Sequence, residues 1–164
     1  MHTPLLRLLV LGVAPAAALV ACADPAPEPS AVVLSAAPET LYVGDDTRND
    51  LTIVIAYADG DGDLGRGVVH VHDCRAAAVV TTITLPSIAS DEAVAEGVAI
   101  TGELELRVND VGDVTLAAAA PPACADLGAP APVVDAAVFC VVLVDSAGNE
   151  GPGDCTSPVA LSRL

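Results

Sequence analysis

The sequence has no tryptophan and no lysine, and it has only one phenylalanine and two tyrosines among 164 residues. Surfaces that bind single-stranded nucleic acids or sugars rely on aromatic platforms, so this composition argues against both functions. The six basic residues, all arginines, face 22 acidic residues, which gives a formal net charge of −16. Such a surface repels nucleic acid and anionic headgroups, and it favours cations and basic partners.

Catalytic motifs are missing as well. The sequence contains no G-x-S-x-G nucleophile elbow, no phosphate-binding glycine-rich loop and no H-E-x-x-H motif. The carboxylates show no spacing that would single out a glycosidase pair. We therefore expect that the chain is not an enzyme.

No apolar run is long enough for a membrane-spanning helix. The run from Leu8 to Ala21 contains Pro15 and falls short of the roughly 20 apolar residues that a spanning helix needs, so it predicts a signal-peptide core. The run ends in Leu19-Val20-Ala21-Cys22, which resembles the lipobox of bacterial lipoproteins. The resemblance implies cleavage after residue 21, lipidation of the Cys22 thiol and durable anchoring by several acyl chains, such as palmitate. Ala23 follows the cysteine, where enteric lipoproteins retained in the inner membrane carry aspartate, so the outer membrane is favoured.

Residues 23–30 read ADPAPEPS, with proline at every second position from 25 to 29. This composition predicts an extended, semi-rigid tether. The chain then divides into a signal peptide (1–21), a lipidated cysteine with its tether (22–30) and one folded domain (31–164).

Four cysteines follow the tether, and an even number in an exported chain predicts two disulfides with three possible connectivities. Turn-like residues midway between Cys140 and Cys155 favour that pair, which leaves Cys74 with Cys124. The alternative is a four-cysteine zinc site. Such sites use close C-x-x-C pairs, which this sequence lacks, so we expect disulfides.

Short strand-like runs recur between turn signals along the rest of the chain. One or two helical turns are expected at 90–97, and no longer helical pattern occurs. Seven to eight strands with turns every 8 to 12 residues predict an all-β fold, an antiparallel β-sandwich. The expected strands are 32–36, 51–57, 68–74, 79–85, 103–108, 114–119, 138–144 and 159–161.

The segment from Val144 to Asn149 (VDSAGN) resembles the F–G hairpin of bacterial immunoglobulin-like and cadherin-like domains. The resemblance implies an immunoglobulin-like or fibronectin-like sandwich. Two departures from the antibody type are the lack of tryptophan on the third strand and the presence of Val138 where a tyrosine corner requires tyrosine. The alternatives to a true antibody-type domain are a fibronectin-like or cadherin-like variant and a jelly roll.

The sharpest local feature is Asp59-Gly60-Asp61-Gly62-Asp63-Leu64-Gly65, which places three carboxylates at alternate positions. Ca²⁺ takes six to eight oxygen ligands, and glycines let the backbone curl so that the carboxylates face one point. The loop resembles D-x-D-x-D calcium loops, including the start of an EF-hand. It departs from the EF-hand at the sixth position, where Leu64 replaces glycine, and at the twelfth, where His70 replaces glutamate.

The sandwich topology predicts further ligands for this loop, because the B–C and F–G loops lie at the same end of an immunoglobulin-like domain. Asp59, Asp61, Asp63 and Asp145 are therefore the expected Ca²⁺ ligands. A solvated Asp-Gly turn is the alternative. Other residues expected in or beside the F–G loop are Asn149, Glu150 and Asp154.

His70 and His72 form an H-x-H pair whose spacing suits a transition metal, although an exposed strand face is the simpler interpretation. The sequence as a whole predicts a lipid-anchored binding or structural module of the cell envelope, with an envelope or surface protein as partner and no nucleic acid. The alternative is an accessory or hydrolytic domain of an envelope enzyme system that uses the acidic loops.

Overall fold

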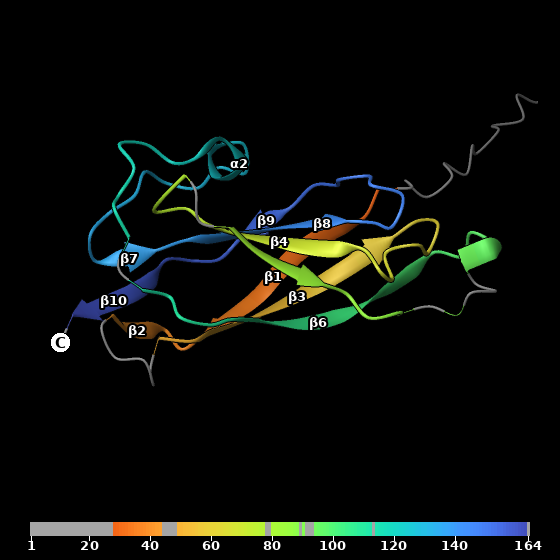
Figure 1. Ribbon diagram of the computed structural model, residues 1–164, viewed down its shortest axis with the longest axis horizontal. Coiled ribbons are helices and arrows are strands. Elements are labelled where there is room, and N and C mark those ends of the chain that lie inside the picture. Colours follow the sequence, from red (N-terminus) through yellow and green to blue (C-terminus); the bar gives the residue numbers. More distant parts are fainter. Residues whose placement is uncertain are drawn as a thin grey trace, which may run out of the picture.

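The computed structural model describes residues 28–43, 49–77, 80–88, 90, 94–112 and 114–163. The expected signal peptide, Cys22 and the part of the expected tether up to residue 27 lie outside these residues. Within the described part, no helix has the length and apolar character that crossing a membrane requires. Figure 1 shows two layers of strands stacked on each other, with little helix.

In the described residues, ten strands form three sheets, ordered β1-β3-β6, β5-β4-β8-β9 and β2-β10-β7. The predicted all-β sandwich is confirmed, with more and shorter strands than the seven to eight expected. The strands are β1 (Ser30–Ala37), β2 (Thr40–Val43), β3 (Leu51–Asp59), β4 (Val68–Asp73), β5 (Val80–Thr84), β6 (Ile100–Val108), β7 (Ala136–Ala137), β8 (Phe139–Val144), β9 (Asp154–Cys155) and β10 (Val159–Arg163).

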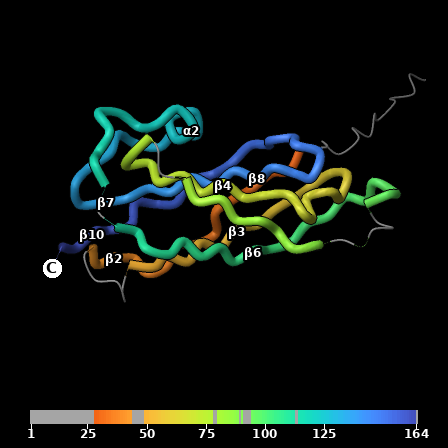
Figure 2. Tube along the Cα trace, in the orientation of Figure 1, coloured from red at the N-terminus to blue at the C-terminus, as the bar shows by residue number. Residues whose placement is uncertain are grey.

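The strand order matches the A-B-E and C′-C-F-G arrangement of an immunoglobulin-like sandwich. One pairing is not antiparallel: β2 runs parallel to β10, with Leu41 beside Leu161. After a cis Ala37–Pro38 bond, the chain leaves the β1-β3-β6 sheet and joins the last strand as β2. Figure 2 shows β2 and β10 together at one end of the molecule.

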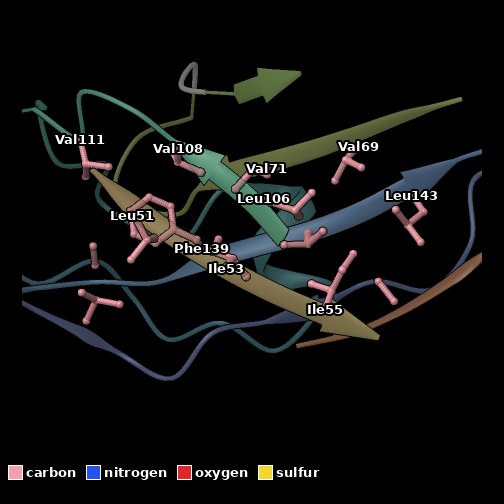
Figure 3. Packing of buried hydrophobic residues seen from close by; sticks show 14 of the residues in the cluster. Leu51, Ile53, Ile55, Val69, Val71, Leu106, Val108, Val111, Phe139 and Leu143 are labelled. Carbon is pink, nitrogen blue, oxygen red and sulfur yellow. The ribbon is translucent and has the colours of Figure 1, made fainter. Parts of the chain in front are cut away.

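The core lies between the β1-β3-β6 and β5-β4-β8-β9 sheets and extends to the β2-β10-β7 sheet. Along β3, alternate residues point inward, and Leu51, Ile53 and Ile55 are fully buried. They pack against inward residues of the facing sheet, such as Val69 of β4 and Leu143 of β8 (Figure 3). Burying a side chain of this size stabilises the fold by about 1.5–3 kcal/mol. Because the core has no tryptophan, its stability comes from the sum of many such aliphatic side chains.

Several predicted elements differ from the structure. The segment 114–119 forms no strand in its described residues; Ala117 donates one backbone hydrogen bond, to Arg75. Ser30, which the sequence placed in the tether, is the first residue of β1, and Pro29 is buried on the domain.

The helical turns were expected at 90–97. There, Val94 donates a hydrogen bond to the Ser90 carbonyl, and the turn ends at a glycine with positive φ, as expected. The sequence did not predict the short helix α2 (Pro122–Ala125).

Both disulfides have the expected connectivity, Cys74–Cys124 and Cys140–Cys155. Cys140 and Cys155 are direct partners in the β8–β9 ladder. Cys74 follows β4, and Cys124 lies on α2. The longer cross-link therefore holds the α2 segment against the end of the sheet.

Candidate metal centre

The acidic loop begins where β3 ends and returns to the sandwich at β4. Asp59, the last residue of β3, is 2 % exposed, and its Oδ2 accepts a 2.7 Å hydrogen bond from the Leu64 N–H. Leu64 is fully buried in the hydrophobic core. The leucine that departs from the EF-hand pattern therefore anchors the loop to the sandwich.

Two glycines allow the close approach of this loop to its neighbours. Gly62 has a φ of +79°, and a Cβ built on it would lie 2.3 Å from the Val98 carbonyl oxygen. A Cβ on Gly67 would lie 2.1 Å from the Val144 carbonyl oxygen, at the end of β8. Any larger residue at either position would push the loop outward.

The loop brings Asp59, Asp61 and Asp63 together, so that one carboxylate oxygen from each lies within 4.8 Å of the others. The Oδ1 atom of each of these residues is buried and accepts no hydrogen bond from the described residues. A buried acceptor without a donor costs about 1–3 kcal/mol, and more when it is charged. Because one loop holds three such atoms, a bound cation or added protons would stabilise the loop.

The F–G loop lies directly against the acidic loop, as the topology predicts. The Ser146 hydroxyl donates a 3.0 Å hydrogen bond to Asp63 Oδ2, and the Ser146 N–H donates a 3.2 Å bond to the Asp63 carbonyl. The Asp145 carboxylate accepts two 2.7 Å hydrogen bonds, from the N–H and the side-chain amide of Asn149. Asp145 lies outside the group of three mutually close carboxylates, and its bonds brace the turn of its own loop.

The carboxylates raise one another's affinity for protons. Burial raises the pKa of Asp59, and the charges of Asp61, Asp63 and Asp145 raise it further, against the lowering effect of the Leu64 hydrogen bond. Burial also raises the pKa of Asp63, as do the charges of Asp145 and Asp61, while the Ser146 bond lowers it. Asp145 therefore contributes negative charge to the site.

Other residues named from the sequence lie elsewhere. Asp154 is directed at β1, where its Oδ2 accepts a 2.9 Å hydrogen bond from the Val33 N–H. Glu150 is exposed, and its charge acts on His72. The rings of His70 and His72 are 6.3 Å apart, and burial, followed by the neighbouring His70, lowers the pKa of His72.

Two residues of the site, Ser146 and Leu64, were not identified from the sequence. A serine after Asp145 gives no signal of a bond to a residue 83 positions away. In the sequence, Leu64 is only a departure from the EF-hand pattern, and its burial in the core and its bond to Asp59 are visible only in the structure.

Comparison with protein-family models, curated proteins and solved structures finds no match to this chain. The chemistry of the site therefore rests on its own atoms. Its donors are carboxylate oxygens with no nitrogen or sulfur among them, a set that suits hard cations such as Ca²⁺.

Proposed function

We propose that the chain is a lipid-anchored lipoprotein of the cell envelope, a binding or structural module whose acidic loop holds Ca²⁺. The observation that supports the cation is the set of three buried Oδ1 atoms, on Asp59, Asp61 and Asp63, that accept no hydrogen bond from the described residues. Without a counter-ion, folding brings like charges together in a partly buried loop. With one, the same charges become ligands.

Ca²⁺ fits this loop better than Mg²⁺. Mg²⁺ demands near-ideal octahedral geometry and keeps several of its waters, whereas Ca²⁺ accepts six to eight oxygens in a flexible shell. Three carboxylates on one curled loop supply charge without octahedral order. Loop carbonyls and water would complete the shell, and Asp145 adds charge from the adjoining loop.

The role of the cation would be structural. The acidic loop joins β3 to β4, and through Ser146 it touches the loop that follows β8. An ion bound to the three aspartates would fix both loops at one end of the sandwich and so form a rigid surface. An envelope or surface protein is the partner class that we propose for that surface.

Isothermal titration of the disulfide-bonded protein tests the cation. We expect one Ca²⁺ per chain, weaker binding of Mg²⁺, and loss of the Ca²⁺ isotherm in Asp61→Asn. Asp61 suits the test because Asp59 and Asp63 also carry hydrogen bonds to Leu64 and Ser146. The matched control is Asp126→Asn, which removes one exposed carboxylate after α2. An isotherm that survives Asp61→Asn unchanged would contradict the site.

Metabolic labelling with palmitate tests the anchor. We expect the wild-type chain to incorporate label and to fractionate with membranes, and Cys22→Ser to do neither. A labelled Cys22→Ser chain would place the lipid elsewhere. An unlabelled wild-type chain in the soluble fraction would refute the anchor while leaving the Ca²⁺ site untouched.

A further inference from the structure

The four cysteines of the folded domain form one cluster. Cys74 Sγ lies 3.3 Å from Cys140 Sγ, although each sulfur is bonded to a different partner. The sulfurs of Cys74, Cys124 and Cys140 all lie within 4.8 Å of one another, and Cys155 is bonded to Cys140. Cysteines this far apart in the sequence form no C-x-x-C pair, but folding brings three of their sulfurs within 4.8 Å of one another and bonds the fourth to one of these three.

The backbone around the cluster is held independently of the sulfurs. Cys74 lies between Asp73 and Arg75, whose buried side chains form an ion pair with a 2.6 Å contact. The Cys74 N–H also donates a hydrogen bond to the Val138 carbonyl, beside β8. Cys140 and Cys155 are partners in a ladder. Opening the disulfides would therefore leave at least three of the cysteines on fixed strands and turns.

We propose that the reduced form of this domain binds one zinc ion through Cys74, Cys124, Cys140 and Cys155. A tetrahedral zinc–thiolate site has Zn–S bonds of about 2.3 Å, which places its sulfurs about 3.8 Å apart. The Cys74–Cys140 contact is already close to that spacing. The two bonded pairs, at about 2 Å, have to separate by rotation of their side chains.

The surroundings favour a metal over free thiolates. Cys124 and Cys140 are fully buried, and Val138 and Leu127 pack against the cluster. Buried thiolates without a counter-charge are costly, so the reduced cysteines stay protonated until Zn²⁺ brings two positive charges against the four thiolates. The soft sulfur donors also separate this site from the acidic loop, whose oxygens suit Ca²⁺.

The chemistry is a two-electron reduction of each disulfide followed by metal binding. Two molecules of a dithiol reductant open the two disulfides, give four thiols and leave as two cyclic disulfides. The first attack falls on Cys155, the only one of the four that is partly exposed. Zn²⁺ then displaces four protons and forms a complex of net charge −2.

The test uses the full chain with Cys22→Ser, which removes the one cysteine outside the cluster. The protein is reduced with a phosphine, freed of reductant without air, and titrated with Co²⁺ and then Zn²⁺. We expect an intense tetrahedral cobalt–thiolate spectrum that saturates at one equivalent and disappears when Zn²⁺ is added. Zn²⁺ should also lower the number of reactive thiols from four to none and raise the melting temperature of the reduced protein only.

Variants separate the sulfur site from the acidic loop. Cys155→Ser should lose the four-sulfur spectrum and leave a weaker three-sulfur one, whereas Asp61→Asn should leave it unchanged. Four thiols that stay reactive in excess Zn²⁺, or a reduced chain that stays unfolded with Zn²⁺ present, would overturn the proposal. Ca²⁺ binding to the oxidised protein is independent of either result, because β8 separates the two sites by about 17 Å between Cys140 and Asp145.

Discussion

The acidic loop gives a prediction in which one substitution changes the sign of its effect. Without Ca²⁺, Asp61→Asn should stabilise the protein, because it removes one of three like charges gathered within 4.8 Å. With Ca²⁺, the same substitution should destabilise it relative to wild type, because a charged ligand is lost. A turn that is merely solvated would give no such reversal.

The magnitudes can be worked out from the geometry. Two charges about 5 Å apart repel by roughly 3 kcal/mol at an effective dielectric constant of about 20. Partial exposure of Asp61 and Asp63 reduces the gain in Asp61→Asn to about 1 kcal/mol. A Ca²⁺ concentration 100 times the dissociation constant stabilises the wild type by about 2.7 kcal/mol, which is about 10 °C in melting temperature for a domain of this size.

The assay is thermal unfolding at neutral pH, in chelator and in about 10 mM Ca²⁺, a concentration 10 to 100 times the dissociation constants of extracellular calcium modules. Ca²⁺ should raise the melting temperatures of wild type and of the control Asp126→Asn by the same amount. Asp61→Asn should melt at a higher temperature than both in chelator and at a lower temperature than both in Ca²⁺. The disulfides stay oxidised throughout. Equal shifts in all three proteins, or an Asp61→Asn variant that is less stable in chelator, would refute the reasoning.

Three further predictions concern the same end of the sandwich. The raised pKa values of Asp59 and Asp63 stabilise the calcium-free protein below the ordinary aspartate pKa of about 3.9, and this stabilisation is lost as the pH rises through the folded-state values. Urea unfolding in chelator should show that loss in wild type and a smaller one in Asp63→Asn; identical pH profiles would exclude it. Ser146→Ala should cost about 1 kcal/mol of stability and weaken Ca²⁺ binding in calorimetry, and unchanged binding would separate the two loops. Gly67→Ala should lower the melting temperature with and without Ca²⁺, because its Cβ would meet the Val144 carbonyl at 2.1 Å; a variant as stable as wild type would show that the loop can move.

The long strands could be predicted because their patterns reflect burial. The residues of β3 alternate because one face of that strand is buried, and β8 is apolar throughout because both of its faces are buried. The short strands β2, β7 and β9 could not be predicted in this way. They have two to four residues each, too few for a period, and they form because longer neighbours offer an edge.

The candidate site was predictable to the extent that it depends on topology. Placing residues 59–63 and 145–149 on two loops at one end of an immunoglobulin-like sandwich was enough to predict that they meet. The hydrogen bond from Ser146 to Asp63 depends on side-chain positions that no spacing encodes. The spacing of the cysteines did not predict their cluster for a related reason. Close C-x-x-C pairs identify metal sites in which two ligands come from one turn, whereas these sulfurs come from β8, β9, α2 and the turn after β4.

The register of the first and last strands determines how force would pass through the domain. Ser30 of β1 pairs with Ala58, beside the acidic loop, and Arg163 of β10 pairs with Val43 of β2. Figure 1 shows β2 and β10 together at one end of the molecule. Tension applied between Ser30 and Arg163 would therefore run along the strands and load both the β1–β3 ladder and the β2–β10 ladder in shear, with many hydrogen bonds resisting at once. Such a domain would act as a stiff link in a chain under load, with the acidic loop beside the point where the pull enters.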